Sequence, residues 1–253
     1  MLIVISPAKR LDDTATLPRG LAATQPDFST EARELTAVAR GLTATDLRRL
    51  MQISPALADL NRARFAEFDT APTRPAALFF AGDTYTGLEA KTLDADALRH
   101  AQDHLRILSG LYGLLRPLDQ IKAYRLEMGS RLTNPRGGDL YAYWRGTIAP
   151  ALNVQARAIG AKALINCASV EYFGAVDAAA LTLPVITPVF LEDREGGAKT
   201  ISFWAKKARG AMARFIIENR LTDPDDLHAF STGGYGWDKA ASARGRPVFR
   251  RVS

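Results

Sequence analysis

Five short apolar runs, separated by segments with helical periodicity, limit the folds open to this chain more than any other feature. The runs occupy residues 1–5, 76–80, 105–108, 163–166 and 185–191. Each has the length of a buried strand, whereas the intervening segments repeat apolar residues at the spacing of a helix. Strands that alternate with helices are typical of α/β proteins. We therefore predict one compact mixed α/β unit over residues 1–253.

Three helical patterns follow one another before the second apolar run. They cover residues 30–39, 44–51 and 55–68. Thr30, Thr43 and Ser54 stand where N-caps are expected, and Pro55 suits the first position of a helix. We predict a helical subdomain at about residues 30–70. Further helices are expected at residues 94–104, 148–159 and 203–219.

The segment at residues 105–129 joins an apolar strand to glycines and then to charged side chains. The strand breaks at Ser109 and Gly110, and glycine is tolerated where the backbone turns sharply or approaches another molecule closely. Arg116 and Glu127 lie in the charged part that follows. A fold needs no such mixture to close a core, so we interpret the segment as one wall of a site. The alternative is a tight strand–loop–helix junction with solvated charges.

Excess positive charge is confined to the last fifth of the chain. The whole sequence has 33 Lys and Arg against 27 Asp and Glu, a net charge of +6. Residues 199–253 alone hold 11 basic and 5 acidic residues, so they carry the entire surplus. A concentrated positive field attracts phosphates from a distance, which favours a polyanionic partner. Many basic proteins bind no nucleic acid, so charge by itself does not decide the function.

The predicted helix at residues 203–219 has an apolar side and a basic side. On a helical wheel the apolar residues gather together, namely Trp204, Ala208, Ala211, Met212, Phe215 and Ile216. The basic residues spread over the opposite side, namely Lys206, Lys207, Arg209 and Arg214. No acidic residue interrupts them before Glu218, so neighbouring cations repel unless an anion joins them. We predict that the basic side contacts phosphates; a merely solvated face is the alternative.

Residues 47–58 have the spacing of a helix-hairpin-helix, a motif whose hairpin amides hold a phosphate at a helix N-terminus. Gln52 and Ser54 replace the two glycines of that motif, and Arg48 and Arg49 lie beside them. These four residues are our candidates for a second nucleic-acid contact. Because both glycines are missing, an ordinary helical hairpin is the alternative.

Charged and polar residues also stand at predicted strand ends and in Gly- or Pro-rich turns, where α/β proteins usually build their sites. These cleft candidates are Ser6, Lys9, Asp83, Tyr85, Arg116, Arg125, Glu127, Asn166 and Glu171. Lys and Arg there could hold phosphate, while Asp and Glu could move protons. The sequence supplies no nucleophile with an identifiable base, so no catalytic residue is assigned. A lattice of ion pairs would give the same pattern.

The few residues that bind metals or form disulfides give no site of their own. Cys167 is the single cysteine, which excludes an internal disulfide and a cysteine-cluster metal site. We interpret it as a small buried thiol. His100 and His104 have a spacing that can bind zinc, but two surface histidines explain them as well. We expect no metal and no cofactor. No run spans a bilayer and residues 1–5 lack the features of a signal peptide, so we expect a cytoplasmic protein with no membrane partner.

Five segments in order, covering nearly the whole chain, carry a family resemblance. They are SPAKRLD, AGDTYTGL, LRILSGLYGLLRPLDQIKAYRLEMG, INCASVEYFGAV and ISFWAKKARGAMARFIIENR. Together they closely resemble the YaaA-type peroxide stress resistance family. The resemblance implies a cytoplasmic bacterial protein of distinctive α/β fold that protects against hydrogen peroxide and limits intracellular iron. It also implies DNA binding through a positively charged cleft and a helix-hairpin-helix, with no established enzymatic activity.

Two features depart from the family pattern. Cys167 stands where an aliphatic residue is expected, which weakens any peroxide chemistry based on this thiol. The basic tail with Arg244, Arg246, Arg250 and Arg251 reads as an extension that adds non-specific affinity.

We therefore expect a DNA-binding protein of the peroxide stress response that contacts the phosphate backbone without sequence specificity and protects against iron-driven damage. The alternative is an uncharacterised enzyme that acts on a phosphate-bearing or nucleic-acid substrate in a basic cleft. Direct iron sequestration is the weakest hypothesis, because no carboxylate cluster has the spacing of metal ligands. Protein partners and oligomeric state are not defined by the sequence.

Overall fold

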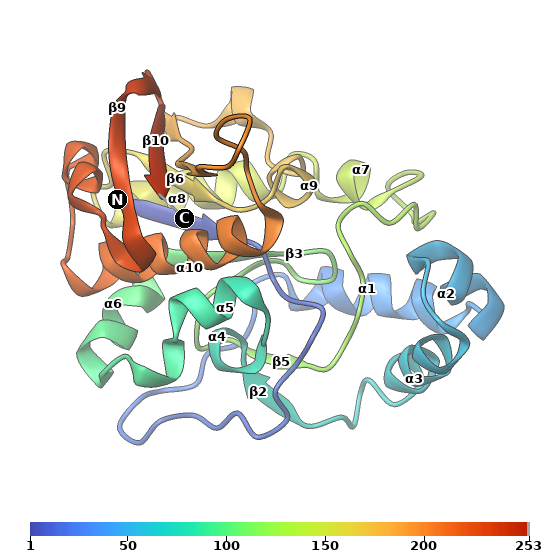
Figure 1. Ribbon diagram of the computed structural model, residues 1–253. Helices are drawn as coiled ribbons and strands as arrows, with labels where there is room; N and C mark the ends of the chain where they lie inside the picture. The colour runs from blue at the N-terminus through green and yellow to red at the C-terminus, as the bar shows by residue number, and fades with distance from the viewer. Residues whose placement is uncertain (252–253) are drawn as a thin grey trace.

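The structure is a computed structural model that describes residues 1–251. It is a mixed α/β fold with several sheets, as the alternating apolar runs predicted (Figure 1). The strands are β1 (Leu2–Ile5), β2 (Thr73–Pro75), β3 (Leu105–Ser109), β4 (Gly113–Leu115), β5 (Gln120–Lys122), β6 (Leu164–Cys167), β7 (Val185–Ile186), β8 (Val189–Glu192), β9 (Tyr235–Ala243) and β10 (Arg246–Arg251). The helices are α1 (Ser29–Arg40), α2 (Ala44–Met51), α3 (Pro55–Ala66), α4 (Ala76–Phe79), α5 (Asp83–Leu88), α6 (Ala95–His104), α7 (Leu140–Trp144), α8 (Ile148–Ala158), α9 (Val170–Phe173) and α10 (Ser202–Glu218).

The central sheet has five strands in the order β4-β3-β1-β6-β7. Strand β1 pairs in parallel with β3 on one side and with β6 on the other, so that Ile3 is opposite both Leu105 and Ile165. All four residues of β1 are buried, as expected for a parallel strand covered on both faces. Helix α10 packs against β1 and β6 (Figure 1).

Two glycines allow α5 and α10 to pack at very short distance. A Cβ atom on Gly87 would lie 1.9 Å from the carbonyl oxygen of Lys207, and one on Gly210 would lie 1.8 Å from that of Thr84. A side chain at either position therefore requires the helices to separate. Through this contact Asp83, at the start of α5, is brought near the basic residues of α10.

The C-terminal basic tail belongs to a second sheet of order β8-β10-β9. Arg250 forms ion pairs with Asp193 and Asp238 at 2.9 and 3.1 Å. Arg251 pairs with the buried Glu192 at 2.5 Å and lies over the Trp204 ring. These two arginines of the tail are therefore engaged within the fold.

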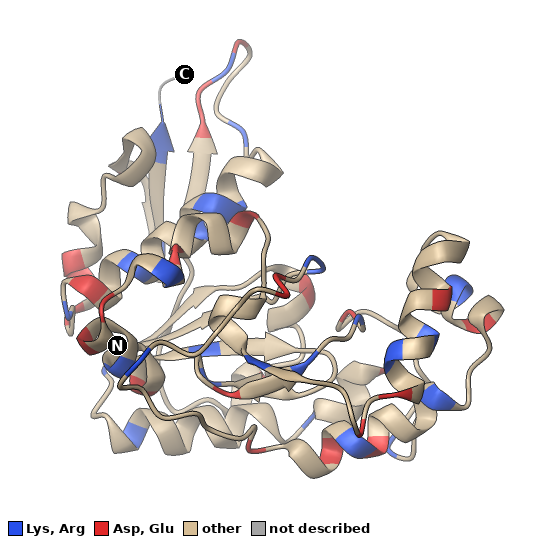
Figure 2. Cartoon of the chain, turned by 90° about the horizontal axis from the view of Figure 1, so that it is seen from below, with Lys and Arg blue, Asp and Glu red and all other residues tan. Residues whose placement is uncertain are grey.

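Helices α1, α2 and α3 follow one another near the N-terminus, and Figures 1 and 2 show α2 and α3 at one end of the molecule, well apart from α10. Thr43 and Asp46 form a reciprocal capping box at the start of α2. Ser54 caps α3, since its Oγ accepts from the Leu57 amide at 3.3 Å. Both predicted caps are confirmed.

Three local predictions were wrong. Residues 76–79 form helix α4 instead of a strand, and Phe80 after it makes only an isolated bridge to Leu11. An apolar run of five residues has no periodicity that separates helix from strand. Helix α1 begins at Ser29 after Phe28, so Thr30 is not its cap. Residues 185–191 contribute to β7 and β8 in two different sheets, and Pro188 between them cannot donate a ladder hydrogen bond.

The segment at residues 105–129 is mostly core. Strands β3 and β4 pair antiparallel and every one of their residues is buried. A Cβ atom on Gly110 would lie 2.3 Å from the carbonyl oxygen of Leu126, and Trp144 Nε1 donates to the Gly110 carbonyl at 3.0 Å. These glycine contacts serve internal packing. Only the end of the segment reaches a cavity.

Candidate functional site

A pocket of about 440 Å³ opens between the segments that follow β1 and β6, the start of α5 and one side of α10. Its chemically active lining consists of Ser6, Lys9, Arg10, Asp83, Cys167, Ser169, Glu171, Tyr172, Lys206 and Arg209. Four of these residues are basic and two are acidic. The pocket therefore brings together cleft candidates from three distant parts of the sequence and two of the predicted phosphate contacts from a fourth.

The position of this pocket follows from the order of the strands. The chain leaves β1 and next enters the sheet on one side as β3, whereas it leaves β6 and continues on the other side as β7. The loops after the carboxyl ends of β1 and β6 therefore diverge. Such a point in a parallel sheet opens a crevice in which α/β proteins commonly bind their ligands.

Hydroxyl groups join the two loops at this crevice. The Ser169 amide donates to Ser6 Oγ at 2.9 Å, and Ser6 Oγ lies 3.3 Å from Ser169 Oγ as its donor. The hydroxyl of Tyr85 donates to the Ser6 carbonyl at 3.2 Å from outside the pocket lining. The side chain and the backbone carbonyl of Ser6 thus each accept a hydrogen bond from another segment.

Arg209 is the least exposed of the basic residues that line the pocket. It is half-buried, and within residues 1–251 its guanidinium has neither a hydrogen bond nor an ion pair. Burial lowers its pKa, and the nearby Cys167 acts in the opposite direction as the lesser cause. Lys206 and Lys207 are exposed and, in the same described range, also lack ion pairs.

Cys167 is one of the residues that line the pocket, although it is almost completely buried. Burial raises the pKa of its thiol to about 12 although Arg209 opposes the shift. Thiolate is the form that reacts with peroxide, so this thiol is unsuited to peroxide chemistry at neutral pH. The sequence-based interpretation as a buried thiol is confirmed.

A chain of charged residues borders the pocket. Glu127 Oε1 contacts Lys9 Nζ at 3.2 Å and Arg125 Nε at 3.0 Å. Its Oε2 is buried and has no hydrogen-bond partner in the described structure. Glu171 Oε1 accepts from the Gly129 amide at 3.0 Å. By contrast, the carboxylate of Asp83 has no such partner among residues 1–251 and faces the pocket.

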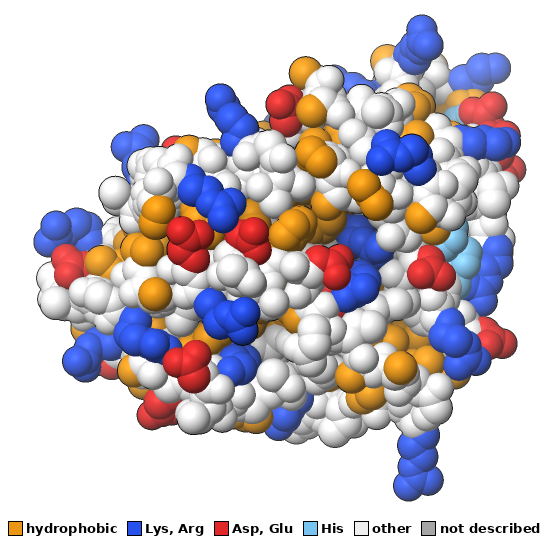
Figure 3. All heavy atoms as spheres, turned by 180° about the vertical axis from the view of Figure 1, so that it is seen from behind, with side chains coloured by type: hydrophobic (Ala, Val, Ile, Leu, Met, Phe, Trp, Pro, Cys, Tyr) orange, Lys and Arg blue, Asp and Glu red, His pale blue; other side chains and the backbone are white. Residues whose placement is uncertain are grey.

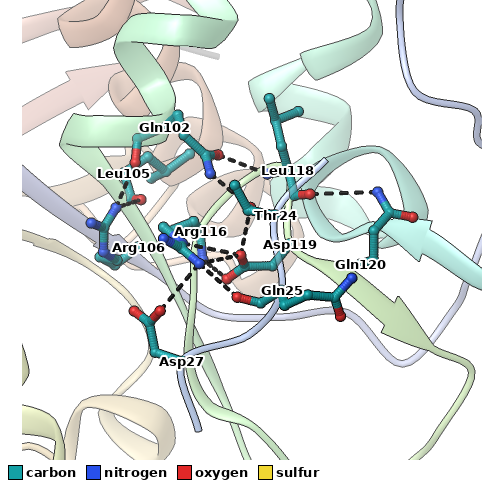
Figure 4. A network of polar contacts seen from close by, with 10 residues as sticks. All are labelled: Thr24, Gln25, Asp27, Gln102, Leu105, Arg106, Arg116, Leu118, Asp119 and Gln120. Atoms are coloured by element: carbon teal, nitrogen blue, oxygen red, sulfur yellow. Dashed lines mark hydrogen bonds and ion pairs between the residues drawn. The ribbon is translucent and has the colours of Figure 1, made fainter. Parts of the chain in front are cut away.

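Three other candidates lie away from the pocket lining. Asn166 is buried and accepts from the Ala168 amide at 3.0 Å. Tyr85 packs against Phe80, with ring centroids 5.5 Å apart, and burial raises the pKa of its hydroxyl. Arg116 belongs to a polar network shown in Figure 4, where it contacts Asp119 and Asp27 at 3.0 and 3.1 Å.

Arg214, predicted to face phosphate, is engaged along α10. Its guanidinium donates to Glu218 at 2.7 Å and to the Glu89 carbonyl at 3.0 Å. It also donates to Thr92 Oγ1 at 2.6 Å. Its donors are thus already used in joining α10 to the segment after α5.

The second group of predicted phosphate contacts is not part of the pocket. Arg48, Arg49, Gln52 and Ser54 are exposed at the α2–α3 connection. Gln52 has the left-handed backbone conformation, with φ 51°, that the missing glycine would adopt readily. Figure 3 shows basic side chains interspersed with acidic and apolar ones over another face, with no continuous basic area there.

Sequence reasoning missed Arg10, Ser169 and Tyr172 as lining residues of the pocket. Arg10 stands next to Lys9 in the same loop, and Ser169 follows an apolar run as the cap of α9. These were the available signals. No group of three His, Cys, Asp or Glu side chains in the described part of the chain is arranged to hold a metal ion. In the same part, none of the helices is long and apolar enough to cross a membrane.

The fold and the pocket define a mixed α/β protein with a predominantly basic cavity at the carboxyl ends of its central parallel strands. A sequence profile of the family described as "Peroxide stress protein YaaA" matches residues 1–241, and the chain belongs to this family. The resemblance seen in the sequence motifs is thereby confirmed.

Similar proteins of the same kind occur in several bacteria. A UPF0246 protein of Cereibacter sphaeroides is 62% identical, and the match covers 100% of both chains. A UPF0246 protein of Dinoroseobacter shibae is 61% identical over 99% of this chain and 95% of the relative. One of Ruegeria pomeroyi is 59% identical over 99% and 98%.

Proposed function

We propose that this protein binds DNA through the phosphate backbone, without reading base sequence, as part of the cell's response to hydrogen peroxide, and that it thereby protects against iron-driven oxidative damage. The family name supports the peroxide part of the proposal. The DNA-binding part of the proposal rests on one observation, the absence of ion pairs at Lys206, Lys207 and Arg209 in the described structure. These residues follow one another along α10 and have no ion-pair partner within residues 1–251.

Unpaired cations on neighbouring turns of a helix repel one another, and a phosphate placed between them relieves that repulsion. Three other arginines of the C-terminal region are already paired within the fold. Arg214, Arg250 and Arg251 are held by Glu218, Asp193 and Glu192 respectively. Within α10, the positive charge available to DNA is therefore concentrated at Lys206, Lys207 and Arg209.

A second contact is proposed at the α2–α3 connection, used as a helix-hairpin-helix. Arg48 and Arg49 are exposed in the last turn of α2, and α3 begins immediately after the connection. The left-handed conformation of Gln52 supports a tight hairpin although glycine is absent. Ser54 Oγ occupies the Leu57 amide. The amide of Ala56 remains at the N-terminus of α3 for a phosphate.

Fluorescence anisotropy with a labelled duplex, titrated over salt concentration, tests the proposal. Each phosphate contact contributes roughly 0.9 to the slope of log affinity against log salt. Replacing Lys206, Lys207 and Arg209 with Ala should therefore lower the slope by about 2 to 3 and weaken binding. The matched control replaces Arg19, Arg131 and Arg194, three exposed arginines elsewhere, and should leave the slope within about 1 of the unmodified protein. Equal losses in both variants would refute the assignment to α10.

An enzyme acting on a phosphate-bearing substrate is the second candidate. The observation in its favour is Asp83, whose carboxylate faces the pocket beside Lys206 and Arg209 without a partner in the described residues. A carboxylate next to a bound phosphate ester could accept a proton from an attacking group. Turnover of nucleotides or DNA that disappears in Asp83→Ala, with folding preserved, would support this function. Absence of turnover across a screen of divalent metals would count against it.

A further inference from the structure

The unpaired charge of the half-buried Arg209 is not fully explained by binding of the DNA backbone. Its guanidinium is half-buried in the pocket, where water screens it less than it screens Lys206 or Lys207. It carries five N–H donors, none of which has a partner within residues 1–251. Cys167, its neighbour in the pocket lining, remains a neutral thiol and supplies no counter-charge. A partly desolvated and unpaired cation is costly, so the pocket is built for an anion.

Two further donors converge on the same cavity. Lys206 precedes Arg209 by one turn of α10, and both side chains line the pocket. Ser169 Oγ accepts a hydrogen bond from Ser6 Oγ at 3.3 Å and from the Tyr172 amide at 3.4 Å. Its own proton is thus available to donate. A guanidinium, an ammonium and a hydroxyl together match the oxygens of a tetrahedral anion.

We infer that this pocket is a receptor site for a phosphate monoester, whose phosphate is bound by Arg209, Lys206 and the Ser169 hydroxyl. A monoester phosphate carries close to two negative charges at neutral pH, and these match the two unpaired cations. A backbone diester carries only one. Lys206 and Arg209 also belong to the proposed DNA contact, so the inference assigns a more specific ligand to part of that surface.

The remaining polar groups of the pocket argue for a small or terminal ligand over a continuous strand. Asp83 and Glu171 line the same cavity and repel a chain of phosphates that runs through it. Their oxygens can instead accept hydrogen bonds from hydroxyl or amino groups on a sugar or base. A cavity of about 440 Å³ lies in the range that holds one small organic molecule. A nucleotide with one terminal phosphate combines these properties.

The same phosphate could come from a free nucleotide or from the 5′-phosphorylated end of a DNA strand. Isothermal titration calorimetry with two matched pairs of probes separates these sources. One pair is dAMP and deoxyadenosine. The other is a short duplex with 5′-phosphate ends and the same duplex with 5′-hydroxyl ends. We expect the phosphorylated member of at least one pair to bind about tenfold or more tightly than its partner, because charge-assisted hydrogen bonds to phosphate are lost otherwise.

Arg209→Gln should abolish the difference within each pair, since glutamine retains polar length but has no charge. Arg157→Gln is the matched control, because Arg157 is an exposed helical arginine that neither lines the pocket nor belongs to the proposed DNA contacts. It should leave the difference unchanged. Circular dichroism spectra and thermal melts of both variants establish that each is folded.

The proposal is overturned if neither phosphorylated probe binds better than its partner, or if the preference survives in folded Arg209→Gln. Binding of dAMP without any binding of either duplex would support the pocket and reject the proposed DNA function. Duplex binding that is equal for phosphate and hydroxyl ends, with no binding of dAMP, would reject the phosphate site in the pocket and support the proposed DNA binding.

Discussion

Arg116, in a turn, and Arg209, on helix α10, are left by the fold in opposite physical states. Arg116 contacts two carboxylates and donates to the Gln25 carbonyl at 2.6 Å (Figure 4). Arg209 has no hydrogen-bond or ion-pair partner in the described structure. Both were candidates for binding phosphate, yet one is already neutralised by its own fold. The comparison shows that unused donors, more than position near a turn or strand, identify an arginine that is ready for a ligand.

The same contrast separates the acidic members of the two regions. Asp119 is buried, accepts from Thr24 Oγ1 at 2.6 Å and from the Arg116 amide at 2.7 Å, and holds Arg116. Burial raises its pKa despite these hydrogen bonds. Asp83 has no comparable contacts within the described range. The network of Arg116 is thus structural, while the pocket retains free groups of both signs.

The largest expected effect is the loss of the buried carboxylate in the Arg116 network. Asp119→Ala should lower the free energy of unfolding by about 3 kcal/mol, because removal of one member of a buried pair leaves its partner uncompensated. Asp27→Ala is the control, since Asp27 is exposed and also pairs with Arg116. It should cost less than about 1 kcal/mol. Urea denaturation measures both values, and equal costs would contradict a buried structural network.

The next effect should fall on the pocket region. Gly210→Ala should lower the free energy of unfolding by about 2 kcal/mol, because the added Cβ meets the Thr84 carbonyl and forces α5 away from α10. Gly138→Ala should have little effect, since no heavy atom lies within 4 Å of the Cβ position there. Chemical denaturation checks the stabilities. An unchanged free energy of unfolding in Gly210→Ala would show that α5 and α10 do not pack at this short distance.

Replacing Arg209 and Arg116 with Met should change the free energy of unfolding in opposite directions. Removal of an unpaired and half-buried charge should raise the free energy of unfolding of the ligand-free protein by about 1 kcal/mol. Arg116→Met should lower it, because Asp119 would then lose its partner. Thermal melts in phosphate-free buffer measure both changes. A destabilised Arg209→Met would mean that Arg209 has a structural role like that of Arg116.

The smallest expected effect concerns the ion pair between Asp12 and Lys91, outside the pocket lining, and depends on pH. Asp12 contacts Lys91 and the Thr14 hydroxyl, and these bonds lower its pKa from 3.8 to about 2. Its ionised form therefore stabilises the folded state above pH 4, and this contribution is lost as pH falls toward 2. The difference in melting temperature between the unmodified protein and Asp12→Asn should accordingly shrink over that interval. A difference that is constant from pH 6 to about pH 2 would contradict the shift.

Local patterns in the sequence determined much of the secondary structure. Thr43 and Ser54 marked the starts of α2 and α3, since a cap acts on amides within three residues of itself. The apolar runs at the start of the chain and at residues 105–108 predicted β1 and β3, because a short apolar run has the length of a buried strand. The strand predicted at residues 76–80 was wrong, because a run of five apolar residues fits a buried helix and a buried strand equally well.

The sequence by itself also determined the family, through motifs spread along the chain, and the total charge of the C-terminal region. Only the tertiary structure decided which of those charges remain free. Arg251 is neutralised by Glu192, which is 59 residues away, while Arg209 meets only a neutral thiol from β6. Charge is carried by each residue, but its neutralisation depends on distances between residues that the fold brings together. This is why the composition predicted an anionic partner and the structure was needed to locate its pocket.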